Sequence, residues 1–230
     1  MTPEQFAQGY IQLIDKPYTW TSFQVVNKLK YILKNDYGLK KVKIGHAGTL
    51  DPLATGLLII CIGKATKQIE TLQSGEKEYT GTFVLGATTP CFDLEKAIDA
   101  TYPTEHITEE MLRTVAQSFV GEIEQVPPTF SAVKINGRRA FDYARNNEEI
   151  EIKPKRITIS EFELTRIAMP EVDFRIVCGK GTYIRSIARD FGAALDSGAH
   201  LKALRRTRIG NFRVEEAQQI DDVREVWKNC

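Results

Sequence analysis

The sequence predicts an α+β fold. Segments with the two-residue period of strands and the 3.6-residue period of helices follow one another, without the regular βαβ alternation of a doubly wound sheet. The chain has 230 residues, of which 42% are hydrophobic and 27% charged, a balance typical of a globular protein whose core needs no disulfide staples. Because no internal repeat, low-complexity tract or Pro/Ser-rich linker divides it, we expect one domain over residues 1–230.

The first half of the chain alternates short strands and helices. Partial alternation predicts a strand at 10–14, which stops before Pro17. Thr21 and Ser22 are typical helix caps, and the helix that they begin has an expected apolar face of Phe23, Val26, Leu29 and Leu33. Further strands are expected at 42–44, 57–62 and 79–85, with a turn and a short helix at 63–72.

The second half contains three further helices and more strands. Thr108 predicts the start of a helix, and the acidic Glu109 and Glu110 suit the positive end of that helix. Asn136-Gly137 is a strong signal for a type I′ turn. Helices are also expected at 140–147 and after Gly179-Lys180-Gly181, and strands at 157–164, 172–178 and 204–209.

Membrane, export and metal signals are absent from the sequence. The longest unbroken apolar run, 57–62, is far shorter than the roughly 20 residues of a transmembrane helix, and the N-terminus has no signal-peptide pattern. The four cysteines form no C-x-x-C pair, and His46, His106 and His200 lie far apart. We therefore expect a cytoplasmic protein with free thiols and no metal site.

The small net charge of +1 hides a strong asymmetry along the chain. Residues 25–50, 131–160 and 175–213 carry net charges of +5, +3 and +7, whereas residues 70–125 carry −8. If the basic segments meet in the fold, they attract phosphates, which favours a nucleic acid as partner. The alternative is that each run is an ordinary solvated face.

The most unusual stretch is the loop 45–56, with the sequence GHAGTLDPLATG. Its glycines allow backbone shapes that other residues resist, and Asp51 is kept out of a helix by the proline that follows it. A carboxylate held there can serve as nucleophile or base; alternatively it caps the next turn. His46 is a candidate for contact with a base or phosphate, or a plain structural histidine.

A second constellation lies at 178–185, with the sequence CGKGTYIR. It predicts a strand end, a glycine turn and a helix start, where backbone amides favour anions. Arg185 is a candidate partner for a buried carboxylate, although alone it is more simply a surface arginine. The nearby pattern Gly63-Lys64-Ala65-Thr66 does not have the spacing of a phosphate-binding P-loop.

Together these segments resemble the catalytic domain of TruB-type tRNA pseudouridine synthases from Gly9 to Ile220. The resemblance rests on motifs in the same order: LIDKP at 13–17, the GHAGTLDPLATGLL loop, KEY at 77–79, PPTFSAVK at 127–134, GRRA at 137–140, YAR at 143–145, GKGTYIR at 179–185, GAHL at 198–201 and LRR at 204–206. The family implies a mixed, mainly antiparallel sheet flanked by helices and loops.

The resemblance also implies an activity: isomerisation of the T-loop uridine at position 55 of tRNA to pseudouridine. The base is flipped into a pocket, detached at C1′–N1 and rejoined through C1′–C5, with no cofactor or metal. This agrees with the physics of RNA recognition, because the reacting atoms are inaccessible inside a stacked loop.

Residue roles are carried over position by position. Asp51 matches the nucleophile, Tyr79 the tyrosine on the target base, and Arg185 the arginine paired with the carboxylate, which favours its charged form. His46, Tyr183, Leu204 and Lys16 match residues that line the substrate site. Lys134, Arg138 and Arg139 are expected to hold the RNA backbone, in a segment around 126–156 that grips the T-arm.

Two alternatives remain open at this stage: an RNA-binding module without catalysis, and a hydrolase that uses Asp51 at C1′ and releases uracil. Whether Asp51 attacks C1′ directly or acts by elimination is also open.

Only about ten residues follow Ile220, so the second RNA-binding domain of the PUA type found in many family members is expected to be absent. The segment Gly86–Asp93 departs from the family pattern. We expect a monomer whose partner is tRNA.

Overall fold

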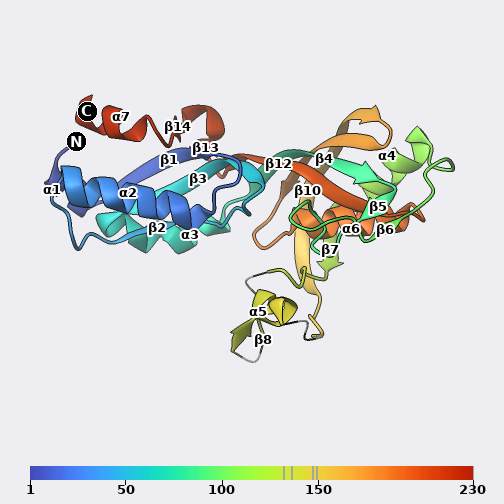
Figure 1. Ribbon diagram of the computed structural model, residues 1–230. Helices are drawn as coiled ribbons and strands as arrows, with labels where there is room; N and C mark the ends of the chain where they lie inside the picture. Colours follow the sequence, from blue (N-terminus) through green and yellow to red (C-terminus); the bar gives the residue numbers. More distant parts are fainter. Residues whose placement is uncertain (132, 136, 147, 149, 230) are drawn as a thin grey trace. The chain divides into compact units, whose positions relative to one another are not determined.

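A computed structural model describes residues 1–131, 133–135, 137–146, 148 and 150–229 (Figure 1). The chain divides into two units, one formed by Met1–Tyr79 with Leu204–Cys230 and the other by Thr80–Ala203. Two strands, β4 (Lys77–Leu85) and β12 (Ala199–Ile209), have residues in both units. The mixture of helices with a mixed sheet confirms the predicted α+β class.

In the first unit the strand order is β14-β1-β3-β12. The central strand β3 (Ala54–Ile62) runs antiparallel to β1 (Tyr10–Lys16) and parallel to β12. The short strand β2 (Ile44–His46) also pairs antiparallel with β3, β14 (Gln218–Gln219) pairs parallel with β1, and β13 (Phe212–Arg213) pairs with β12. The loop between β2 and β3 therefore lies at the end of the sheet where β3 begins.

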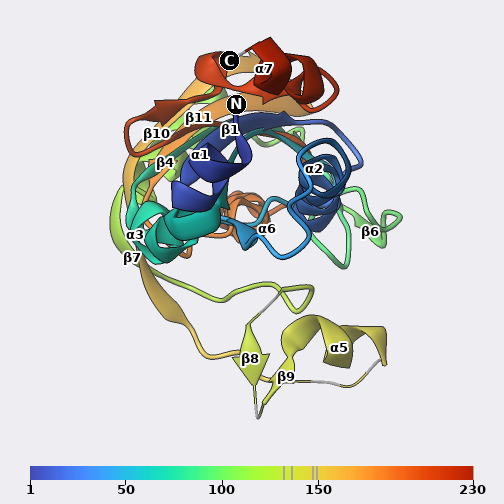
Figure 2. The same ribbon diagram turned by 90° about the vertical axis from the view of Figure 1, so that its left-hand side faces the viewer.

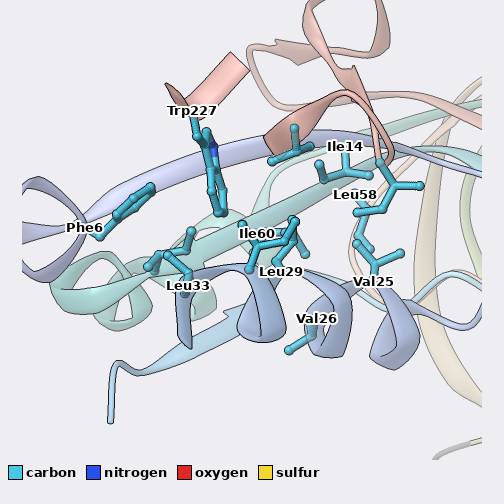
Figure 3. Close-up of a cluster of buried hydrophobic side chains, with 13 residues drawn as sticks. Phe6, Ile14, Val25, Val26, Leu29, Leu33, Leu58, Ile60 and Trp227 are labelled. Atoms are coloured by element: carbon cyan, nitrogen blue, oxygen red, sulfur yellow. The ribbon is translucent and has the colours of Figure 1, made fainter. Parts of the chain in front are cut away.

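Both faces of β3 are buried, because its side chains alternate between two cores. Leu58, Ile60 and Ile62 pack with α1 (Pro3–Gln8), α2 (Ser22–Asp36) and α7 (Val223–Asn229), and Figure 3 shows Leu29 and Leu33 of α2 turned toward Ile60. Leu57, Ile59 and Cys61 face the other core, beside the 3₁₀ helices η1 (Gly63–Gln68) and η2 (Val214–Glu216) and the helix α3 (Ile69–Ser74).

Helix α2 confirms the predicted start but not the whole predicted apolar face. Thr21 is the N-cap and accepts a hydrogen bond from the Gln24 backbone, which completes a capping box. The buried stripe consists of Val25, Val26, Leu29, Ile32 and Leu33. The expectation for Phe23 was wrong: its side chain is 66% exposed. Ile32, on the same side as Leu29, completes the stripe instead, and Phe23 lies in the first turn on another face.

The second unit contains the strand order β4-β11-β10-β7. Strand β10 (Lys155–Ala168) runs antiparallel to both β11 (Glu171–Cys178) and β7 (Gly121–Gln125). Phe83 and Phe174 stack with their ring centroids 4.2 Å apart, and both are buried. The helices α4 (Glu109–Ser118) and α6 (Ile184–Ala194) belong to this unit, as does the small pair β5 (Ala87–Thr88) and β6 (Ala100–Thr101).

The segment around 126–156, which the sequence analysis expects to grip RNA, contains β8 (Lys134–Ile135), β9 (Arg138–Arg139) and α5 (Ala140–Arg145), which lie next to one another in Figure 2. The two strands pair antiparallel, and Gly137 between them has a positive φ of 84°. This backbone favours glycine, as the predicted turn requires. The other turn residue, Asn136, and the predicted helix end, Asn147, lie outside the described residues.

Among the described residues, Cys61, Cys91 and Cys178 form no disulfide and are buried, whereas Cys230 lies outside the described part. Within the described ranges, no helix has the length and apolar character that crossing a bilayer requires.

Candidate active site

In the first unit the loop between β2 and β3 carries Asp51. The residue before it, Leu50, is fixed to the start of α2: its backbone N–H donates to Ser22 Oγ at 2.9 Å, and the same hydroxyl donates back to the Leu50 carbonyl at 3.1 Å. Gly48 has a φ of +101°, a conformation that costs other residues energy. The backbone on which Asp51 is carried is therefore restrained at Leu50 by the bonds to Ser22 and has a glycine-specific conformation at Gly48.

Arg206 on β12 holds the same loop from the opposite side. Its guanidinium is buried and donates to the carbonyls of Leu57 (2.8 Å), Gly48 (3.0 Å) and Thr49 (3.4 Å). A Cβ atom at Gly56 would lie 2.3 Å from the Arg206 carbonyl oxygen, so only glycine lets the two strands approach this closely. One charged side chain thus binds both ends of the loop that contains Asp51.

Lys16 binds the residue that follows Asp51, Pro52, through its backbone carbonyl. The side chain is fully buried, and Nζ donates to the carbonyls of Pro17 (2.9 Å), Trp20 (2.5 Å) and Pro52 (3.3 Å). Burial lowers the Lys16 pKa from 10.5 to about 8, while the charge of Asp51 raises it and that of Arg206 lowers it further. Two buried cationic side chains, Lys16 and Arg206, therefore bind backbone carbonyls of the loop that carries Asp51.

His46 is the last residue of β2 and pairs in register with Ile60. Burial, followed by the Arg206 charge, lowers the His46 pKa, and a hydrogen bond with the Gly48 backbone partly opposes this. Its Nδ1 atom is buried without a hydrogen-bond partner in the part of the chain that the structure describes. Burial and the neighbouring positive charge thus favour the neutral form of the imidazole.

Leu204 and Tyr79 lie on strands of the same unit. Leu204 is paired in register with Ala54, whose N–H donates to the Asp51 carbonyl at 3.1 Å. Tyr79 lies on β4, and its side chain is buried. The structure thus places Lys16, His46 and Leu204 beside the loop of Asp51. Their role in lining a substrate site stays a prediction.

In the second unit Arg185 lies in the first turn of α6 and is buried. It donates to the carbonyls of Cys91 (3.1 Å) and Phe130 (3.0 Å), and its Nε lies 3.5 Å from an Asp93 carboxylate oxygen. Asp93 is itself buried and accepts from the Glu95 backbone at 3.0 Å. The guanidinium therefore joins α6 to two loops of this unit, one that contains Cys91 and Asp93 and one that contains Phe130. Its predicted pairing with Asp51 stays a prediction.

Tyr183 is the N-cap of α6, and its backbone is held by one amide side chain. Gln125 Oε1 accepts from the Tyr183 N–H at 2.8 Å, and Gln125 Nε2 donates to the Tyr183 carbonyl at 3.1 Å. The glutamine is buried at the end of β7. This reciprocal pair fixes the direction in which α6 begins, and with it Arg185.

Of the proposed RNA-backbone residues, Arg138 is described with its side chain. Both Nη atoms lie 3.2 Å from Glu148 carboxylate oxygens, and the guanidinium lies 4.2 Å from the centre of the Tyr143 ring. The side chains of Lys134 and Arg139 lie outside the described part. An RNA phosphate at Arg138 must therefore replace or join Glu148.

Sequence reasoning missed the positioning roles of four residues: Ser22 and Arg206, which hold the loop of Asp51 in the first unit, and Asp93 and Gln125, which hold Arg185 and Tyr183 in the second. Arg206 belongs to the LRR motif at 204–206, but the motif does not indicate what its side chain binds. Asp93 belongs to the segment 86–93, which departs from the family pattern, so the resemblance implies no role for it. Ser22 was predicted as a cap, but its bonds to Leu50 cross 28 residues of sequence. Gln125 carries no local signal, because its partner is 58 residues away.

Two family models match the chain. Residues 34–184 match the N-terminal domain of the TruB family of pseudouridylate synthases, and residues 185–230 match a C-terminal domain of tRNA pseudouridylate synthase B. Together the two matched ranges run from α2 to the end of the chain.

Curated relatives match over nearly their whole lengths. The chain is 61% identical to tRNA pseudouridine synthase B of Flavobacterium johnsoniae, covering 96% of each chain. It is 57% identical to the protein of that name from Phocaeicola vulgatus, covering 94% of this chain and 92% of the other.

Among solved structures, a Cbf5-Nop10-Gar1 complex contains a chain that is 30% identical, with a TM-score of 0.74. A second, an H/ACA ribonucleoprotein bound to a substrate RNA with 2′-deoxyuridine, gives 29% identity and a TM-score of 0.70. This chain is covered to 99% and 100%, respectively, but spans only 57% of either matched chain.

Proposed function

The chain belongs to the TruB family of pseudouridylate synthases, and we propose that it isomerises the T-loop uridine at position 55 of tRNA to pseudouridine. The observation that carries the proposal is the loop of Asp51, whose backbone carbonyls accept hydrogen bonds from the buried side chains of Arg206 and Lys16. A carboxylate presented on so constrained a backbone suits attack on a sugar carbon.

The proposed reaction conserves every atom of the substrate. The uridine is flipped out of the loop, the C1′–N1 bond breaks, the base turns, and a C1′–C5 bond forms. The proton on C5 is then lost and N1 gains one. Asp51 is the nucleophile, Tyr79 packs on the base, and His46, Tyr183, Leu204 and Lys16 line the site.

Arg185 is proposed to pair with Asp51. Its guanidinium has five N–H groups in a rigid fork, which allows it to hold more than one acceptor. Asp93, Cys91 and Phe130 fix the orientation of that fork. In this proposal Asp93 is a positioning residue that acts through Arg185.

The proposed partner is the T-arm of tRNA, gripped by a segment around 126–156 that includes Lys134, Arg138 and Arg139. The net charge of +3 over residues 131–160 supports this, because phosphate contacts dominate RNA affinity. We also propose that the chain is a single catalytic domain, that it acts as a monomer, and that it works in the cytoplasm.

Incubation with an unmodified tRNA transcript, followed by mapping of pseudouridine, tests the function. We expect one pseudouridine, at position 55. Release of free uracil would indicate the hydrolase instead, and tight binding without any modified base would indicate a module that only binds RNA.

A further inference from the structure

The two most exposed large apolar side chains of the described residues lie on one helix. Phe23 is 66% exposed and Tyr31 is 61% exposed, and both are on α2. Aromatic rings held in water on a helix whose other face already fills the core make no contribution to that core. They are therefore candidates for contact with a partner.

Phe23 and Tyr31 belong to one continuous stripe. At about 100° per residue, Phe23, Asn27, Lys30, Tyr31 and Lys34 fall within one side of the helix, and all five are exposed. We call these five residues the outer stripe of α2. Figure 3 shows Leu29 and Leu33 turned toward the strands, which leaves the outer stripe on the solvent side.

The outer stripe is positively charged. Across the described ranges, neither Lys30 nor Lys34 has an ion-pair partner, whereas Lys28, off the stripe, lies 4.0 Å from Asp221. The one acidic residue of α2, Asp36, pairs with Arg224 at 2.7 Å. The helix is followed by Lys40, Lys41 and Lys43, all exposed. The charge of this surface suits phosphate groups.

The outer stripe begins beside the candidate catalytic loop. Phe23 directly follows Ser22, whose hydroxyl is bonded to the backbone of Leu50, the neighbour of Asp51. An RNA strand whose uridine reaches Asp51 therefore passes close to the first turn of α2. Both features lie in the same unit.

We propose that the outer stripe of α2 binds the substrate RNA, with Lys30 and Lys34 at phosphates and Phe23 and Tyr31 stacked on unpaired bases. The inference rests on the proposed function, which supplies the RNA. Alternating cationic and aromatic side chains are the usual composition of surfaces for unpaired RNA, because every base has a face on which a ring stacks. A protein partner or a second copy would have no need of two unpaired lysines.

Two double variants separate the charge from the stacking. Lys30→Gln with Lys34→Gln should weaken binding of an unmodified tRNA transcript and reduce the slope of log affinity against log salt by roughly 1.4–1.8, from two contacts. Phe23→Ser with Tyr31→Ser should weaken binding about ten-fold or more with the slope unchanged. Single-turnover rate at saturating enzyme should stay at the wild-type value in both.

The control is Lys28→Gln with Lys67→Gln, which removes two exposed positive charges of the same unit outside the stripe. An equal effect of the control and the stripe variants on affinity and slope would overturn the proposal. So would unchanged tRNA affinity, whether or not sedimentation showed a change in oligomeric state. Pseudouridine formation by the wild-type protein is measured in the same series, so that failure of the proposed function is recognised separately.

Discussion

At the scale of single residues, Asp51 carries the proposed chemistry, and its position depends on neighbours that do not react. Lys16 and Arg206 reach its loop from β1 and β12 through carbonyl groups. Because each bond ends on the backbone, the loop keeps its shape whichever charge state Asp51 has.

Asp51→Asn should abolish isomerisation and leave tRNA binding intact. The amide keeps the shape of the side chain but loses the negative charge that makes the carboxylate a nucleophile, and a loss of at least about a thousand-fold is usual when a nucleophile is removed. Single-turnover conversion and filter binding measure the two effects. The matched control is Asp15→Asn, which changes a carboxylate paired with Arg205. Substantial single-turnover activity in the Asp51 variant would refute its role as nucleophile.

Arg206→Met should slow the single-turnover reaction by about 100-fold, since small misplacements of a reacting group cost this much. It should also destabilise the protein by about 3–5 kcal/mol, because buried carbonyls lose a charged donor. Arg206→Lys should recover part of both losses, and tRNA affinity should stay unchanged. Arg205→Met, at the preceding residue, removes a partly buried pair with Asp15 and no bond to the loop of Asp51 among the described residues. Equal kinetic effects at 205 and 206 would contradict the positioning role.

Lys16 should make stability depend on pH in a defined window. Its pKa is about 8 in the fold against 10.5 unfolded, so the unfolded chain binds more protons between these values and the free energy of unfolding rises with pH there. The contribution is roughly 3 kcal/mol across the window. Urea unfolding at pH 7.5, 9 and 10 checks it. Lys16→Arg should lose this rise, and an identical pH dependence of the variant would contradict the assignment.

At the scale of elements, the sequence predicts best what is local or strictly periodic. The strand at 57–62 is visible because both faces of β3 are apolar, and α2 because Thr21 and Gln24 form a capping box. Phe23 was misassigned because helical spacing alone does not say which face meets the sheet. Asp51 is found through its motif, whereas Asp93 and Gln125 become visible only when α6 brings distant segments together.

The ion pair of Asp93 and Arg185 should stabilise the second unit, because it joins α6 to the loop that follows β5. Both side chains are less than 10% exposed. Asp93→Ala should lower the free energy of unfolding by about 3–5 kcal/mol, since it leaves a buried cation without this partner. A double-mutant cycle with Arg185→Met measures the coupling. Additive effects of the two changes would show that the pair contributes nothing specific.

At the scale of the whole molecule, the charge pattern distinguishes the binding surfaces from the rest of the chain. Net charges of +5, +3 and +7 occur in three segments and −8 in one. The total of +1 gives no indication of this, and the sequence alone does not say which charges are already paired. The structure shows that Arg138 is paired with Glu148 and that Lys30 and Lys34, in the described part of the chain, have no such partner.

Replacing Lys134, Arg138 and Arg139 together by Gln should weaken tRNA binding and flatten its salt dependence. Each phosphate contact contributes very roughly 0.7–0.9 to the slope of log affinity against log salt. Arg138 should contribute less than a full contact, because binding a phosphate competes with the Glu148 carboxylate.

Glu148→Gln should accordingly strengthen binding in the wild-type background and have no effect once Arg138 is Gln. An unchanged slope in the triple variant would mean that these groups form only a solvated face. A large loss of single-turnover rate at saturation would place them in the catalytic pocket instead.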